Sequence, residues 1–82
     1  MFTLTTVPTR QELCDAWSKA SRELDEETAR RCEALADEWL ASDMSAIEKD
    51  RRLEGIQRWR AAQIEAEKCA WYDGLRALER VA

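Results

Sequence analysis

Two stripes of apolar residues at helical spacing, separated by one short polar segment, constrain the fold of this chain most strongly. Within each stripe the residues stay on one side when successive positions are placed about 100° apart around a helix. The polar segment between the stripes, Ala41-Ser42-Asp43-Met44-Ser45, predicts a turn. The stripes are Leu13, Trp17, Ala20, Leu24, Thr28, Leu35 and Trp39, then Leu53, Ile56, Ile64, Trp71, Leu75, Leu78 and Val81. This pattern predicts an all-α protein, an antiparallel helical hairpin of two long helices.

Two capping boxes mark where the expected helices begin. In Thr9-Arg10-Gln11-Glu12 the Thr9 hydroxyl can accept from the Glu12 amide, while the Glu12 carboxylate accepts from the Thr9 amide. Ser45-Ala46-Ile47-Glu48 repeats the pattern before the second stripe. We expect a single helical domain over residues 1–82, with an extended arm at 1–8, helix one at 9–41, a turn at 42–45 and helix two at 46–80.

The ends and the middle of helix one leave two points open. Pro8 pushes the residue before it out of the helical region, so the arm is extended, and Phe2 and Leu4 are expected to pack on the far end of helix two. Acidic residues favour helix N-termini, so the segment Leu24-Asp25-Glu26-Glu27 could start a new helix and give three helices instead of two.

Pairing the two stripes across the turn predicts a register and several contacts. The expected facing pairs are Trp39 with Ile47, Leu24 with Ile64, Trp17 with Trp71, and Leu13 with Leu75. Charged pairs at i,i+4 are expected on the outer faces: Glu26 with Arg30, Glu27 with Arg31, Glu48 with Arg52, and Glu54 with Arg58. The interior glycines Gly55 and Gly74 suggest close approach of another helix, and Cys14, Cys32 and Cys69 are expected at core edges.

Arg60 and Glu67 fall near the centre of the second stripe, where a polar residue is costly unless it is paired. One interpretation pairs Arg60 with Glu26, and Glu67 with Lys19 or Arg22, or lets both side chains reach solvent. The other makes them a buried ionic layer that sets the register of a dimer. The sequence favours neither.

Composition narrows the possible functions. The 82 residues contain no histidine, which removes the usual general base and the usual transition-metal ligand, so we expect no catalytic site, cofactor or metal. No apolar run approaches the ~18–20 residues of a bilayer span, and the N-terminus lacks a signal-peptide layout, so we expect a cytoplasmic protein without membrane insertion. The net charge of −4 makes nucleic acid an unfavourable partner.

Two alternative functions stay open. Basic residues at Arg30, Arg31 and between Lys49 and Arg60 could contact phosphates, which would suit a DNA-associated regulator. A cluster of carboxylates on helix one could hold Mg²⁺, as in a helical nucleotide hydrolase. That cluster consists of Glu23, Glu26, Glu27, Glu33 and Asp37.

The preferred interpretation is a non-enzymatic protein-protein interaction module, which acts as an inhibitor, adaptor or regulator and forms a homodimer. Its composition also suits an inhibitor encoded by a bacterium or bacteriophage. Two amphipathic helices leave part of each stripe uncovered, and a second hairpin would close a four-helix bundle. Trp59 lies at the margin of the second stripe. We expect it either to anchor a partner or to form part of the dimer core, and the sequence favours the two interpretations equally. The expected partner surface comprises Trp59, Ile56, Gln63, Arg52, Arg60, Glu23, Glu26 and Glu27.

Overall fold

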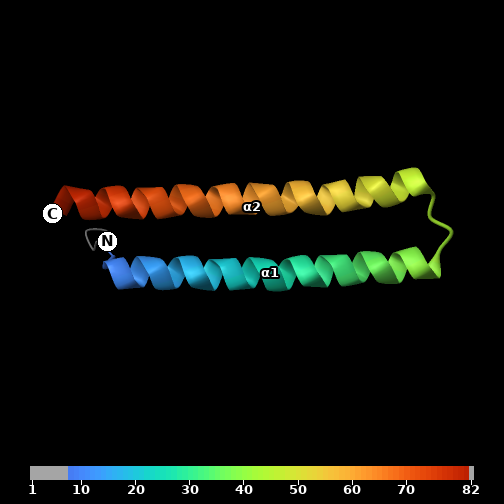
Figure 1. Ribbon diagram of the computed structural model, residues 1–82, viewed down its shortest axis with the longest axis horizontal. Coiled ribbons are helices and arrows are strands. Elements are labelled where there is room, and N and C mark those ends of the chain that lie inside the picture. Colours follow the sequence, from blue (N-terminus) through green and yellow to red (C-terminus); the bar gives the residue numbers. More distant parts are fainter. Residues whose placement is uncertain (1–7, 82) are drawn as a thin grey trace, which may run out of the picture.

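The computed structural model describes residues 8–81 and shows two helices that run antiparallel, joined by a short connection (Figure 1). α1 spans Arg10–Ala41 and α2 spans Ala46–Val81, with 32 and 36 residues. The predicted hairpin is confirmed. α1 is continuous through Leu24 and Asp25, so the alternative of a break there is wrong. The predicted arm, including Phe2 and Leu4, lies outside the described residues except for Pro8.

Local hydrogen bonds account for both helix starts. The Thr9 hydroxyl accepts from the Glu12 amide at 3.1 Å, and the Thr9 amide donates to the Glu12 carboxylate at 2.9 Å, which completes the predicted capping box. At α2 the Glu48 amide donates to the Ser45 hydroxyl at 3.2 Å, whereas the Glu48 carboxylate accepts from Arg52. α1 ends at Ala41, and the next residue, Ser42, has an extended backbone and caps the helix.

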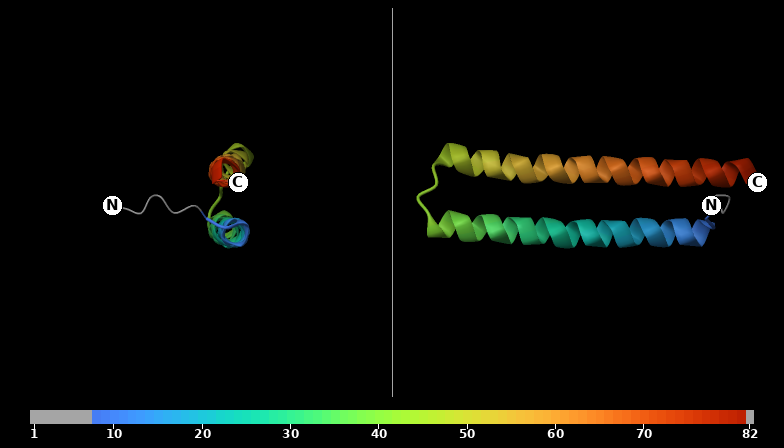
Figure 2. Two further views of the ribbon diagram at one scale, coloured as in Figure 1. Left: turned by 90° about the vertical axis from the view of Figure 1, so that its left-hand side faces the viewer. Right: turned by 180° about the vertical axis from the view of Figure 1, so that it is seen from behind.

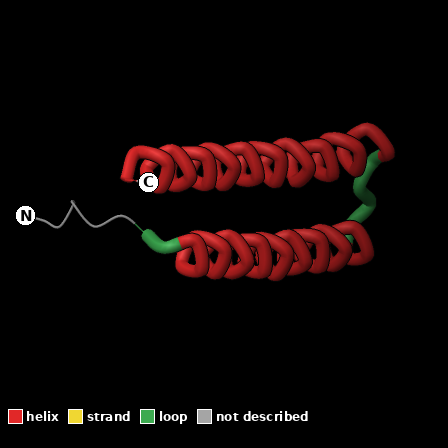
Figure 3. Tube along the Cα trace, turned by 60° about the vertical axis from the view of Figure 1, so that its left-hand side comes forward, coloured by secondary structure: helices red, strands yellow, loops and turns green. Residues whose placement is uncertain are grey.

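The helices lie side by side over their whole length as a single layer (Figures 2 and 3). Such a pair encloses very little, because each helix faces only one neighbour. Within residues 8–81, Leu24 and Leu35 are the only buried side chains, at 8% and 6% exposure. The other stripe residues are half-buried or, at Leu53 and Val81, exposed.

Contacts between the helices confirm the predicted register at one end of the hairpin. The rings of Trp17 and Trp71 lie with centroids 5.5 Å apart. Gly74 lies against Leu13, since a Cβ on this glycine would be 2.5 Å from Leu13 Cδ1. The close approach predicted for Gly74 is therefore present.

Three expectations about packing are wrong. Ile47, which was expected to pack toward Trp39, is 67% exposed, and the Lys49 ammonium lies over the Trp39 ring, 4.5 Å from its centroid. A Cβ placed on Gly55 would have no atom within 4 Å, so no close packing within the hairpin explains why glycine occupies this position. The cysteines Cys14, Cys32 and Cys69 are free and exposed, not at core edges, because a single layer of two helices has no depth to cover them.

Candidate interaction surface

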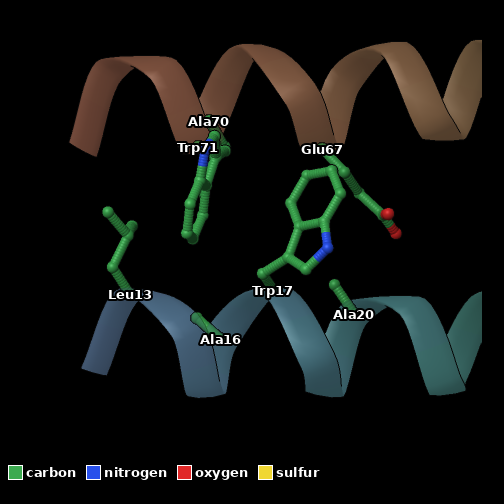
Figure 4. A pocket seen from close by; sticks show the side chains of 7 residues that line it. All are labelled: Leu13, Ala16, Trp17, Ala20, Glu67, Ala70 and Trp71. Carbon is green, nitrogen blue, oxygen red and sulfur yellow. The ribbon is translucent and has the colours of Figure 1, made fainter. Parts of the chain in front are cut away.

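A hollow of about 230 Å³ lies between the helices near the open end of the hairpin (Figure 4). The tilted rings of Trp17 and Trp71 form its walls, and small alanine side chains beside them leave the space open. Glu67 supplies the only charged side chain among the lining residues. These residues are Leu13, Ala16, Trp17 and Ala20 from α1, and Glu67, Ala70 and Trp71 from α2.

A second hollow, of about 270 Å³, continues the first toward the middle of the hairpin. The two share Ala20 and Glu67, so they form one groove along one side of the helix pair. We call it the tryptophan groove. It is lined by Leu13, Ala16, Trp17, Ala20, Glu23, Leu24, Glu27, Trp59, Gln63, Glu67, Ala70 and Trp71.

Trp59 is half-buried at the inner end of this groove. The guanidinium carbon of Arg31 lies 3.8 Å from its ring centroid, a cation–π contact between the two helices. Arg31 Nε also donates to the Glu27 carboxylate at 3.2 Å, and Arg30 donates to the same carboxylate at 2.8 Å. The hydrogen bond from Arg30, with a smaller effect of Arg31, holds the pKa of Glu27 below its ordinary value.

The predicted partner residues do not all gather at one place. Four of them, Glu23, Glu27, Trp59 and Gln63, line the tryptophan groove. Ile56 is half-buried elsewhere on α2, and Glu26 is exposed.

Two predicted charge pairs involving Glu26 are wrong. Arg60 donates to Asp25 at 2.9 Å, and Arg30 pairs with Glu27. Long arginine side chains reach carboxylates on neighbouring turns, so position along the helix alone does not select between adjacent acidic residues. The predicted pairs Glu27 with Arg31, Glu48 with Arg52, and Glu54 with Arg58 are present.

Arg52 joins the helices near the turn. It donates to Glu38 of α1 at 2.6 Å and to Glu48 of α2 at 3.3 Å. Both hydrogen bonds, the one to Glu38 foremost, raise the pKa of the Arg52 guanidinium. All three side chains stay accessible to water, so this cluster orients the helices more than it stabilises them.

Glu67 lies half-buried between the two hollows. The ion pairs of residues 8–81 include none to Glu67, so the predicted pairing with Lys19 or Arg22 is wrong. The apolar pattern predicts that Trp17 and Trp71 face each other, but it does not predict the groove beside them. The available signal was the set of alanines beside the tryptophans, since small side chains at helical spacing leave a large ring uncovered.

Two observations concern other classes of function. In residues 8–81 no group of three or more cysteine, aspartate or glutamate side chains is placed to hold a metal ion. Neither of the helices described there combines the length and apolar character that a membrane crossing requires.

Comparison with known proteins gives no match among protein-family models, curated proteins or solved structures.

Proposed function

We propose that this chain is a non-enzymatic protein-protein interaction module, which self-associates and acts as an inhibitor, adaptor or regulator by occupying a surface of another protein. The tryptophan groove is the observation that carries the proposal. Trp17, Trp59 and Trp71 each bury only part of their rings in it. Tryptophan is the residue type most enriched at interaction hot spots, and uncovered apolar grooves with polar rims are typical of interfaces.

Self-association follows from the shortage of core. Two helices leave one side of each apolar stripe in water, and a second hairpin packed on that side would convert the layer into a four-helix bundle. Leu24 and Leu35 are the only buried side chains that the described residues supply. A homodimer is therefore the assembly that we propose.

The surface around Trp59 is the proposed contact for a protein partner. Arg31 already covers one face of the Trp59 ring, which fixes the indole in place and lowers the entropy lost on binding. The proposed compartment is the cytoplasm, where the exposed thiols of Cys14, Cys32 and Cys69 would stay reduced.

A capture experiment tests this proposal. Wild-type, Trp59→Ala and Tyr72→Ala baits are incubated with lysate of the source cell, and a captured protein is then purified and titrated. Tyr72 is a matched control, an aromatic residue of α2 that is 53% exposed and lies outside the groove. If Trp59 is an anchor, Trp59→Ala should weaken binding by about 2 kcal/mol while helicity and assembly mass stay unchanged.

Other results would change or overturn the proposal. If Trp59→Ala melts the protein or splits the dimer, Trp59 is structural, and the partner surface moves to the acidic face of α1. If the wild-type chain neither captures a protein nor self-associates, the interaction module itself is refuted.

A further inference from the structure

We propose that the tryptophan groove binds an amphipathic helix of the partner protein, and that this helix carries a lysine or arginine on its apolar face. The basic side chain lies between Glu23 and Glu67, and the apolar side chains on either side of it pack against the tryptophans. This inference rests on the proposed function and deepens it, because it names the chemistry of the partner segment.

The charged residues that line the groove are all acidic. Glu23, Glu27 and Glu67 line its two hollows, whereas no lysine or arginine lines either of them. The Glu27 carboxylate already accepts from Arg30 and Arg31. An acidic partner segment would therefore be repelled by the groove, and a basic segment would be attracted.

The Glu67 carboxylate has no cation beside it. Glu67 is half-buried, and Figure 4 shows its side chain extending from α2 into the space beside Trp17 and above Ala20. The ion pairs of residues 8–81 do not involve it. A docked helix would remove the water that solvates this carboxylate, and a basic side chain on that helix would offset the cost.

Glu23 supplies a second carboxylate to the inner hollow, which it lines together with Glu67. Lys19 lies one turn before Glu23 on α1, but within residues 8–81 neither carboxylate forms an ion pair with it. Trp17 lines the adjoining hollow, and the face of an indole attracts cations. A lysine or arginine at this place would gain both ion pairing and cation–π attraction.

The walls of the groove favour a helix over an extended strand as the occupant. Both walls are α-helices, whose backbone N–H and C=O groups bond within each helix, so the groove offers a strand no backbone partners. A helix satisfies its own backbone groups, and the small side chains of Ala16, Ala20 and Ala70 let it approach closely. From Leu13 to Glu27 the groove follows α1 for about 21 Å, which matches about four turns of a partner helix.

Partner binding and self-association use different parts of the surface. The partner helix fills the hollows between α1 and α2, whereas Ala66, which is exposed on the flank of α2, lines neither hollow. That flank and the opposite face of the helix pair stay free for a second copy.

Selection from a peptide library tests the chemistry of the partner segment. A displayed library of helical peptides of about 15 residues, randomised along one face, is panned against the full chain. We expect the recovered peptides to carry a lysine or arginine with apolar residues three or four positions away on the same face. One recovered peptide is then synthesised and titrated against the wild type and its variants.

Glu67→Gln should weaken binding of this peptide at least tenfold, because it keeps the shape of the side chain and removes the charge. Glu33→Gln is the matched control, since Glu33 is an exposed carboxylate of α1 that lines neither hollow, and its affinity should stay within about twofold of the wild type. A peptide with norleucine in place of its basic residue should bind the wild type and Glu67→Gln equally. Should Glu67→Gln fail to fold by circular dichroism, Glu23→Gln, at an exposed position, repeats the test.

Three results would overturn the inference: recovered peptides without a basic residue, equal affinity of the wild type and Glu67→Gln, or no recovered peptide at all. The proposed function would survive them if the chain still captures a protein through Trp59, and it falls only if the chain neither captures a protein nor self-associates. A fall of the assembly mass to that of one chain on addition of peptide would show that a second copy occupies the groove, which would also overturn the inference.

Discussion

Trp17 of α1 and Trp71 of α2 lie with ring centroids 5.5 Å apart and ring planes inclined by 59°. This tilted geometry suits the charge distribution of aromatic rings, and the pair sets the register of the open end of the hairpin. Both rings remain half-buried, because no third helix covers them. The same contact therefore stabilises the hairpin and forms the wall of its proposed interface.

Removing one ring of this pair should destabilise the protein. Trp71→Ala is expected to lower the free energy of unfolding by about 2–3 kcal/mol, below the usual range for a fully buried tryptophan because the ring is only partly covered. Urea denaturation measures the change. The neighbouring Tyr72 is exposed and provides the control, since Tyr72→Ala should stay within about 0.5 kcal/mol of the wild type. Equal losses in both variants would contradict the role of the ring pair.

The sequence predicted the elements of this fold well because their causes are local. Capping residues, apolar periodicity and the lack of interior proline act within a few turns, and they placed both helices and the turn to within a residue. The Trp17 and Trp71 contact also followed, since pairing two stripes across a short turn leaves few registers.

The predictions that were wrong depend on how far long side chains reach and on how deeply two helices can bury a residue. Arg60 pairs with Asp25, not Glu26, because a long side chain selects a carboxylate by its direction around the helix. Ile47 is exposed, although the pairing of the two stripes predicts that it faces Trp39 near the turn. Whether a groove forms beside Trp59 depends on the gap between the two helices. The spacing of residues along one helix does not determine that gap.

The two glycines of α2 should respond differently to alanine. Gly55→Ala is expected to raise the free energy of unfolding by about 0.5–1 kcal/mol, because nothing surrounds the new methyl group and alanine favours the helix. Gly74→Ala gains the same propensity but places its Cβ 2.5 Å from Leu13 Cδ1, so Leu13 must move. We expect Gly74→Ala to be at least about 1 kcal/mol less stable than Gly55→Ala in thermal and urea unfolding. Equal stability of the two variants would show that Gly74 has no packing role.

Protonation of Glu27 should weaken the native state in acid. Its pKa in the folded protein is lowered from 4.5, chiefly by the hydrogen bond from Arg30. A lowered carboxyl pKa contributes stability that is complete above the unfolded value and is lost as pH falls through the folded value. Arg30→Gln should move the Glu27 pKa upward, as measured by carboxyl NMR, whereas Arg58→Gln should not, since Arg58 pairs with Glu54. An unchanged Glu27 pKa in Arg30→Gln would refute this cause.

A charge placed on the groove side of α2 should split the dimer. Ala66 is exposed and lies one helical turn before Ala70, which lines the groove, so Ala66→Arg is expected to weaken self-association at least tenfold, about 1.4 kcal/mol. Ala61 is also exposed but lies roughly 140° away around the helix. Ala61→Arg should leave the dimer unchanged, and circular dichroism should show both variants folded. Equal effects of the two substitutions would move the interface to another face.

Sedimentation equilibrium of the wild-type chain at micromolar concentration tests the central claim, self-association through an uncovered face, most directly. The chain has a mass of 9.5 kDa, so the account predicts a species of about 19 kDa, twice that value. Its circular dichroism should show well over half of the residues in helix. A well-folded, highly helical species of 9.5 kDa across the same concentrations would contradict the account, because a stable hairpin would then need no second copy to complete its core.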